Sequence, residues 1–167
     1  MITHSASEQL ISVQSARPPR SRAYVVRDSP LHGRGVFATR DIAAGTRVIE
    51  YKGERISTAT ATERGSMDPA NPYHTFFFSL DDGSLIDGGV NGNAARWINH
   101  CCEPNCEPKE IKGRIFIDTL RDISSGEELH YDYRLALEGR HTAKLKQAYR
   151  CLCGTPDCRH TMLAPKR

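Results

Sequence analysis

Three cysteines near the C-terminal end of the sequence constrain the fold more than any other feature. Cys151, Cys153 and Cys158 lie in the segment CLCGTPDC, with the spacing C-x-C-x4-C around a Gly-Thr-Pro turn. Thiolates with this spacing can converge on one tetrahedral zinc ion. The alternative, in which the three thiols are simply buried apolar groups, is disfavoured by this spacing. Three thiolates are one short of a closed structural site, so another segment has to supply the fourth ligand.

The fourth ligand is expected in the stretch RWINHCCEPNC at 96–106, because this stretch holds the only other cysteines in the sequence. Cys106 is the predicted ligand, since it follows the turn-forming residues EPN and ends the motif. Cys101 and Cys102 are adjacent, so in an extended segment their side chains point to opposite sides. We therefore predict that Cys102 packs in the core as a small apolar residue.

Two histidines and one other use of the thiols remain as alternatives. His100 and His160 are rival donors, because a site of three cysteines and one histidine is chemically allowed. A catalytic thiol at Cys101 or Cys102 would need an activating base, and His100 is a neighbour in sequence. Neighbours in a chain need not face each other, so the sequence favours a structural metal site over a catalytic thiol.

The length and composition fit one globular domain. The chain has 167 residues, of which 38% are hydrophobic and 26% are charged, which suffices for a hydrophobic core. No apolar run is long enough to cross a bilayer, and the N-terminal sequence MITHSASEQLISVQS lacks the basic and apolar segments of a signal peptide. These features predict no membrane partner and a cytoplasmic or nuclear setting, where cysteines are more often ligands than disulfides. Export by a route that needs no such segment stays open.

The net charge of +3 is unevenly distributed along the chain. From Arg134 to the C-terminus, eight basic residues stand against two acidic ones. This excess fits a solvated basic face, or a surface that attracts an acidic or nucleic-acid-associated partner. Acidic residues elsewhere, among them Glu50, Glu54, Asp81 and Asp82, could equally favour a basic peptide.

Short β-rich segments between turns dominate the sequence, and helical patterns are few. Residues 1–22 are rich in Ser, Pro and Arg and are predicted to form a flexible arm. The predicted strands lie at 23–29, 47–56, 74–80, 112–120 and 127–133. The predicted helices are short and lie at 57–66, 93–100 and 137–150. A mainly-β domain with irregular connections is therefore expected.

Four motifs follow one another along the chain. They are GRGVFA with DIAAGTRVIEYKGERI, then GNAARWINHCCEPNC, then GEELHYDY, and last the C-terminal cysteines followed by RH. Together they resemble the SET-domain protein lysine methyltransferases, and the last motif resembles the post-SET zinc module of that family. The resemblance implies a β-clip-like SET fold of small curved sheets with a knot-like substructure. It also implies a catalytic SET domain at 23–136 and a helical linker with a zinc-bound post-SET segment at 137–167.

The resemblance implies S-adenosylmethionine as the cofactor and S-adenosylhomocysteine as its product. Asn99 and His100 fall on the family's N-H pair, which holds the adenosyl part of the cofactor. The Gly-rich turn of the first motif and three further positions complete the predicted contacts: His32, Gly33, Arg34, Gly35, Phe76, Leu137 and Leu152. At Phe76 the family has a tyrosine, so one hydrogen bond is expected to be lost while the ring remains. One structural zinc ion is implied beside this pocket, held by Cys106 and the three C-terminal cysteines.

Two tyrosines of the third motif are the predicted catalytic residues. Tyr133 matches the family's terminal tyrosine, whose hydroxyl lies at the mouth of the lysine channel. Tyr131 matches a Phe-or-Tyr position that limits how many methyl groups are added, and tyrosine there implies mono- or dimethylation. Asp132 between them is expected to be a buried hydrogen-bond acceptor rather than a base.

By this resemblance the chain is expected to methylate the ε-amine of a protein lysine. A histone tail is the expected substrate, bound as an extended strand by a monomeric enzyme, with nucleic acid involved only indirectly. Chromatin in the nucleus is then the expected location, whereas a bacterial protein of this kind would act in the cytoplasm or in a host cell. The alternative is a catalytically silent SET-like module that binds peptides, but such a module would lose Tyr133 or the Asn99–His100 pair.

Overall fold

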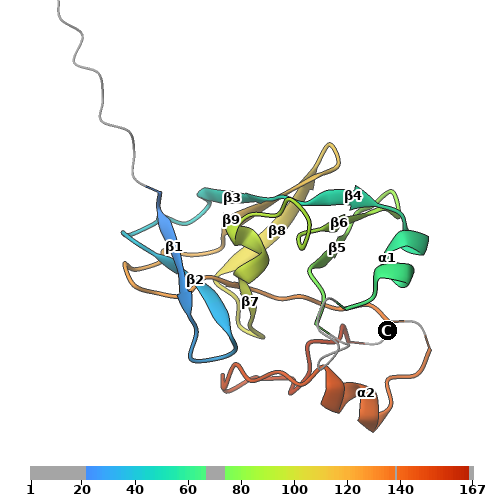
Figure 1. The fold of residues 1–167 in the computed structure, drawn as a ribbon. Helices are drawn as coiled ribbons and strands as arrows, with labels where there is room; N and C mark the ends of the chain where they lie inside the picture. The colour runs from blue at the N-terminus through green and yellow to red at the C-terminus, as the bar shows by residue number, and fades with distance from the viewer. Residues whose placement is uncertain (1–21, 67–73, 138, 166–167) are drawn as a thin grey trace, which may run out of the picture.

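The computed structural model describes residues 22–66, 74–137 and 139–165. Its strands are β1 (Tyr24–Asp28), β2 (Arg34–Ala38), β3 (Arg47–Tyr51), β4 (Glu54–Ile56), β5 (Phe77–Ser79), β6 (Leu85–Asp87), β7 (Asn99–His100), β8 (Cys106–Ile111), β9 (Arg114–Thr119) and β10 (His130–Tyr131). Its helices are α1 (Thr58–Arg64), the 3₁₀ helix η1 (Ala94–Trp97) and α2 (Ala143–Ala148). Strands dominate the described part of the chain, so the predicted mainly-β fold is confirmed (Figure 1).

The strands are arranged in small sheets rather than in one large sheet. β1 and β2 form an antiparallel hairpin, β9 lies between β3 and β8, and β6 lies between β4 and β5. β7 and β10 pair in parallel, with Asn99 opposite His130 and His100 opposite Tyr131. This pairing brings the predicted cofactor-binding pair beside the predicted catalytic strand, although the two are far apart in the sequence.

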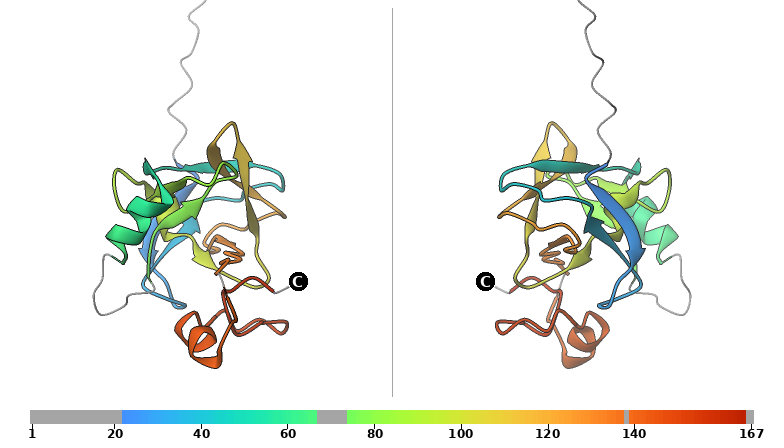
Figure 2. Two further views of the ribbon diagram at one scale, coloured as in Figure 1. Left: turned by 90° about the vertical axis from the view of Figure 1, so that its right-hand side faces the viewer. Right: turned by 90° about the vertical axis from the view of Figure 1, so that its left-hand side faces the viewer.

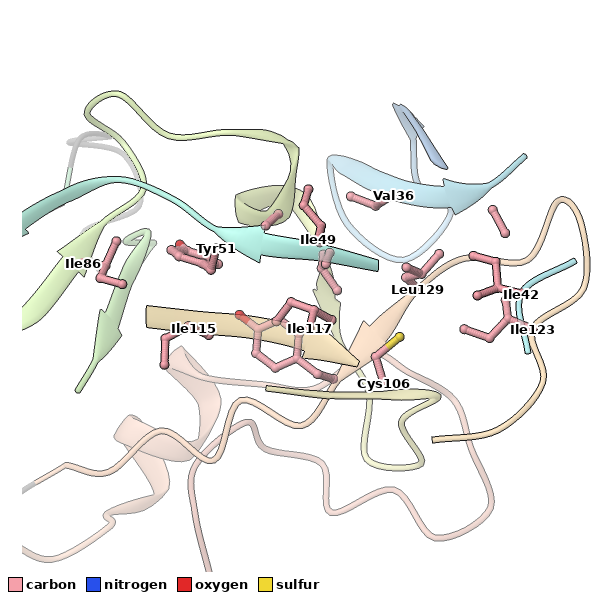
Figure 3. Close-up of a cluster of buried hydrophobic side chains, with 14 of the residues drawn as sticks. Val36, Ile42, Ile49, Tyr51, Ile86, Cys106, Ile115, Ile117, Ile123 and Leu129 are labelled. Atoms are coloured by element: carbon pink, nitrogen blue, oxygen red, sulfur yellow. The ribbon is translucent and has the colours of Figure 1, made fainter. Parts of the chain in front are cut away.

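The hydrophobic core is built from alternating positions of these strands. In β9, Ile115 and Ile117 are buried, while Phe116 between them points the other way, under the guanidinium groups of Arg47 and Arg114. A strand with this alternation buries one of its two faces. Figure 3 shows the resulting cluster, which draws on most of the sheets: Val36, Ile42, Ile49, Tyr51, Ile86, Cys106, Ile115, Ile117, Ile123 and Leu129.

The helices are shorter than the sequence predicts. α1 lies within the predicted helix 57–66 and is capped by the hydroxyl of Ser57. η1 is capped by Asn93, as predicted, but it ends before Asn99–His100, which form β7. α2 covers only the second part of the predicted helix 137–150.

The C-terminal segment folds back onto the residues that follow β10. Leu135 pairs with Leu163 in a short parallel bridge, and the N–H of Leu135 donates to the carbonyl of Met162 at 3.0 Å. Leu163 is almost fully buried, so this contact extends the core. Figure 2 shows the segment, in orange and red, at the end of the domain opposite β3.

Two further predictions concern the ends of the chain and its membrane partners. The flexible arm predicted at 1–22 lies outside the described residues, apart from Arg22. Among the helices that the structure describes, none is both long enough and apolar enough to cross a bilayer.

Candidate active site and metal centre

A cavity of about 600 Å³ opens between the β1–β2 turn, the segment before β5, η1, β7 and the residues after β10. The C-terminal segment completes its wall with residues 148–153 and Met162. Ten of the eleven residues predicted for catalysis and cofactor binding line this cavity: His32, Gly33, Arg34, Phe76, Asn99, His100, Tyr131, Tyr133, Leu137 and Leu152. The fold therefore gathers positions from most of the sequence around one space, while the role of each residue stays a prediction.

The side chain of Asn99 ties β7 to the β1–β2 turn. Its Nδ2 lies 2.9 Å from the carbonyl of Arg34, 3.3 Å from the carbonyl of His32 and 2.9 Å from Oε1 of Glu128. An amide nitrogen has two N–H groups, so these protein acceptors already use both of them. Asn99 thus fixes the shape of the turn, and only its Oδ1 and its backbone remain for a ligand.

Two glycines, Gly33 in the β1–β2 turn and Gly35 in β2, have different surroundings. Gly33 has a φ of 50° and no atom within 4 Å of the place where a Cβ would lie, so it leaves open backbone on the cavity. Gly35 does not line the cavity, in contrast to the prediction that it contacts the cofactor. A Cβ at Gly35 would lie 2.1 Å from Oε1 of Glu128, so this glycine makes room for the carboxylate instead.

Three tyrosines form the polar end of the cavity. The rings of Tyr131 and Tyr133 lie 5.0 Å apart, and the hydroxyl of Tyr133 donates to the carbonyl of Ile98 at 2.7 Å. The hydroxyl of Tyr51 donates to the carbonyl of Phe76 at 2.7 Å. Burial raises the pKa of all three phenols above the usual value, so each is a neutral group at physiological pH.

Tyr51 was not among the residues predicted from the sequence. It ends β3, where the pattern RVIEY places Ile49 and Tyr51 on the same, buried face. That alternation marks Tyr51 as a core position but does not distinguish a ring that packs from a hydroxyl that faces a cavity.

The cavity offers the surfaces that an adenosyl group requires. Phe76 and Trp97 meet edge to face, with ring centroids 5.1 Å apart, and Leu137 and Leu152 add apolar surface. Aromatic and apolar walls with a few polar groups are typical of cofactor pockets. The residues present therefore fit S-adenosylmethionine, with the open backbone at Gly33 beside the polar part of the wall.

His100 links the cavity to the cysteines. Its Nδ1 accepts a hydrogen bond from the backbone N–H of Tyr133 at 3.1 Å, and its Nε2 lies 3.5 Å from Sγ of Cys102. Burial lowers the pKa of His100 to about 4, so the ring is neutral at pH 7. Since Nδ1 accepts, the single proton is on Nε2 and points at the sulfur.

Four cysteines converge beside the cavity: Cys102, Cys151, Cys153 and Cys158. Their Sγ atoms all lie within 4.8 Å of one another, and Sγ of Cys102 is 3.7 Å from that of Cys151 and 4.0 Å from that of Cys158. Zinc with Zn–S bonds of about 2.3 Å would place sulfur atoms roughly 3.8 Å apart at the corners of a tetrahedron. The donor set and its spacing therefore fit one structural zinc ion.

The prediction of Cys106 as the fourth ligand is wrong. Cys106 begins β8 with no exposed surface, lies in the hydrophobic core (Figure 3), and has its thiol pKa raised to about 12 by burial. Cys102, predicted to pack in the core, points to the cluster instead. Cys101 is not one of the four converging cysteines, although it lies near Cys153, and its Sγ donates to the carbonyl of Glu103 at 3.3 Å. The sequence could not tell which cysteine of the 96–106 stretch joins the C-terminal three.

The two rival histidine donors also lie outside the cluster. His160 is exposed and contacts Cys158 only through its backbone N–H, which donates to Sγ at 3.3 Å. His100 touches Cys102 from outside the group of four sulfurs. The N–H of Arg159 donates to Sγ of Cys102 at 3.4 Å, a bond that favours the thiolate form required of a metal ligand.

The fold and the site together define a class of protein: a mainly-β domain of small sheets in which a Gly-containing turn, the N-H strand and two tyrosines surround one cavity next to a four-cysteine cluster. The SET domain family model matches residues 33–134, and the chain belongs to this family. The resemblance seen in the sequence motifs is therefore confirmed.

The chain is similar to curated histone-lysine methyltransferases. The chain is 42% identical over 135 residues to the histone-lysine N-methyltransferase trithorax of Drosophila melanogaster, covering 78% of this chain and 3% of that protein. It is 39% identical over 145 residues to the H3 lysine-4 specific histone-lysine N-methyltransferase of Saccharomyces cerevisiae, covering 84% and 13%. It is 41% identical over 135 residues to histone-lysine N-methyltransferase 2B of Homo sapiens, covering 78% and 5%. The chain thus spans only a small part of the length of these relatives.

Two solved structures share the fold. One is ctPRC2 in an autoinhibited conformation bound to S-adenosylmethionine, with a TM-score of 0.61 and 36% identity. The other is an active polycomb repressive complex 2 in the stimulated state, with a TM-score of 0.62 and 35% identity. Each match covers 68% of this chain and 15% of the other chain.

Proposed function

We propose that this chain transfers a methyl group from S-adenosylmethionine to the ε-amine of a lysine in a protein, with a histone as the first candidate. The observation that carries the proposal is the single cavity in which the Asn99–His100 strand and the buried phenols of Tyr131 and Tyr133 meet. The identity of about two fifths to histone-lysine methyltransferases supports this choice over other substrates.

The chemistry requires an uncharged lysine. S-adenosylmethionine, when bound, supplies a methyl group on a positively charged sulfur, which a neutral amine can accept. With a free pKa near 10.4, only about one lysine in a few thousand is neutral at pH 7. The aromatic wall around Tyr131 and Tyr133 disfavours the charged ammonium form, because burial raises the cost of a charge.

Tyr133 acts by positioning rather than as a base. Burial raises the pKa of its phenol, so the tyrosinate form is rare at neutral pH. Its hydroxyl hydrogen is directed at the carbonyl of Ile98, which leaves the oxygen lone pairs free to accept a hydrogen bond from the incoming amine. The lysine loses its ammonium proton to solvent before it is aligned, and the chain's contribution is to hold the neutral amine in line for the transfer.

Tyr131 limits the number of methyl groups in this proposal. Its ring lies between those of Phe78, at 6.1 Å, and Tyr133, at 5.0 Å. It is 7% exposed, so its hydroxyl occupies space that a larger amine would need. Mono- and dimethyllysine are the expected products.

The four-cysteine cluster holds a structural zinc ion in this proposal. Thiolates are the preferred ligands of zinc in closed structural sites, and the segment that carries three of the cysteines also forms part of the cavity wall through Leu152. The ion stabilises that wall and takes no part in the methyl transfer.

The remaining parts of the proposal concern the substrate and its setting. A histone substrate implies that the protein works on chromatin in the nucleus. The substrate tail binds as an extended strand whose backbone is recognised more than its side chains, and one copy of the chain suffices for the reaction.

The test is methyl transfer from tritiated S-adenosylmethionine to histone octamers, to nucleosomes and to total cell protein. We expect label on histones, mass-spectrometric detection of mono- and dimethyllysine, and loss of label with Tyr133→Phe. Label on other proteins but not on histones would reject the histone part alone. A folded, cofactor-binding protein that labels nothing would reject the enzymatic function and favour a silent peptide-binding module.

A further inference from the structure

Glu128 is a buried carboxylate directly behind the cavity wall. It lies between the turn at Gly126 and β10, and it is 7% exposed. Its Oε1 accepts a hydrogen bond from Nδ2 of Asn99 at 2.9 Å, and its Oε2 accepts one from the hydroxyl of Ser29 at 2.9 Å. The missing side chain of Gly35 provides the space for this arrangement.

The charge of Glu128 has no cationic partner among the described residues. The one basic group in ion-pair range is Nε2 of His130, at 3.7 Å, and it makes no hydrogen bond. Burial lowers the pKa of His130 despite the neighbouring carboxylate, so its ring is neutral at pH 7. A buried carboxylate without a cation is costly. Its presence therefore calls for a positive charge from elsewhere.

A buried and a half-buried carboxylate elsewhere in the domain differ in this respect. Asp87 is paired with Arg64 at 2.7 Å, and Asp132 is paired with Arg159 at 2.6 Å. Their charges are compensated within the protein, whereas that of Glu128 is available to a ligand.

The cavity wall itself supplies cations and no anions. Its described lining contains no Asp or Glu, and it includes four arginines: Arg34, Arg96, Arg134 and Arg150. Such a wall would repel a positively charged ligand. Glu128 lies one side chain behind it, and its charge reaches the site, because it adds to burial in raising the pKa of Tyr133.

We propose that Glu128, which lies behind Asn99, is a positioning residue whose negative charge compensates the positive charge on the sulfur of S-adenosylmethionine. The site therefore binds the charged cofactor more tightly than its neutral product. This inference rests on the proposed function. Before transfer, the carboxylate attracts the sulfonium and holds the Asn99 amide that shapes the turn. After transfer the carbon–sulfur electron pair stays on sulfur, the sulfur is neutral, and the attraction ends, which favours release of S-adenosylhomocysteine.

The decisive measurement is the ratio of two affinities, by isothermal titration calorimetry, in the wild type and in Glu128→Gln. Glutamine keeps an acceptor for Asn99, and the hydroxyl of Ser29 can turn to accept from its amide, so the shape of the wall is retained. Loss of one charge across a single layer of side chains should weaken S-adenosylmethionine binding roughly tenfold. Binding of S-adenosylhomocysteine should change less than about twofold.

Two control variants make the result specific. Glu128→Asp keeps the charge and should retain the preference for the charged cofactor. Glu107→Gln removes an exposed charge from β8 and should change neither affinity. Equal weakening of both ligands by Glu128→Gln, or no weakening, would overturn the proposal, since a purely structural role would not separate them.

A second variant keeps the proposal testable if Glu128→Gln does not fold. Ser29→Lys places a cation beside the intact carboxylate from a half-buried position and should also lower the affinity ratio; an unchanged ratio would overturn the proposal. A wild-type protein that binds neither ligand would reject the proposed function as a whole. A wild type that binds both, with an unchanged ratio in the variants, would reject only the role of Glu128.

Discussion

The carboxylate of Asp132 accepts two hydrogen bonds from the guanidinium group of Arg159, at 2.6 and 2.9 Å. Asp132 lies in sequence between the two catalytic tyrosine candidates, and Arg159 directly follows the cluster residue Cys158. The N–H of Arg159 also donates to Sγ of Cys102. This pair therefore couples the position of the metal cluster to the position of the tyrosines.

Replacing Arg159 should loosen that coupling. Arg159→Ala removes a bidentate, partly buried pair and should lower the free energy of unfolding by about 1–3 kcal/mol. Zinc content and S-adenosylmethionine affinity should fall as well, as measured by metal analysis and calorimetry. Arg159→Lys keeps the charge without the paired geometry and should give intermediate values. Unchanged zinc content and stability in Arg159→Ala would show that the pair contributes nothing.

Removing the hydroxyl of Tyr133 should separate catalysis from cofactor binding. Tyr133→Phe keeps the ring in its buried place but removes the group proposed to orient the amine, so turnover should drop at least about 100-fold. The dissociation constant of S-adenosylmethionine should change less than about threefold. Tyr24→Phe on β1 is a matched control and should retain full turnover. Wild-type turnover in Tyr133→Phe would exclude the assigned role.

Two serine variants should distinguish the metal ligand from the core cysteine. Cys102→Ser removes a ligand and should abolish stoichiometric zinc, as measured by mass spectrometry of the metal. Cys106→Ser should retain zinc, yet it places a hydroxyl in the core and should cost about 1–3 kcal/mol of stability. The opposite pattern, with zinc lost only in Cys106→Ser, would restore the sequence prediction.

The loop that carries Glu128 should be sensitive to acid through its neighbour Glu127. A hydrogen bond from Arg121, at 2.6 Å, holds the pKa of Glu127 at about 2, below its ordinary value near 4.5. A carboxyl group whose pKa is lowered by folding stabilises the fold at pH values above its pKa in the unfolded chain. This contribution is lost as the pH falls from about 4.5 towards 2. Glu127→Gln should therefore be less stable than the wild type at pH 7, by about 1–3 kcal/mol.

The measurement for Glu127 is chemical denaturation at several pH values. The difference in unfolding free energy between the wild type and Glu127→Gln should narrow below pH 4.5. A difference that stays constant down to pH 3 would mean that the ion pair is not its source.

The short β-rich segments of the sequence predicted the fold class, and four motifs in the order of one family pointed to residues that line the cavity. The N-H strand, the Gly-rich turn and the last strand meet through the β7–β10 pairing and the hydrogen bonds of Asn99. The sequence did not predict the β7–β10 pairing itself, because residues 93–100 were expected to be helical throughout.

The errors arose where the answer depends on contacts between distant segments. Whether Cys102 or Cys106 faces the cluster is decided by the start of β8, whose first residue turns into the core. Tyr51 and Glu128 carry ordinary core and turn patterns, and only contacts with distant segments place them at the site: Tyr51 bonds to Phe76, and Glu128 pairs with Phe37 of β2. Gly35 was predicted to contact the cofactor, but the group next to its Cα is the carboxylate of Glu128, which comes from a distant segment.

The C-terminal wall of the cavity has a consequence for how the protein is made. Strands β1 to β10 precede Cys151, so they can pack while the chain is still being synthesised, since domains fold as they emerge from the ribosome. The cavity wall is complete only after Leu152 and Met162 have been added to the chain and the four cysteines have bound zinc. Chains made in a zinc-starved cell would then have folded strands but an incomplete cofactor site. The molar ratio of zinc to protein would equal the fraction of chains whose cavity wall is complete.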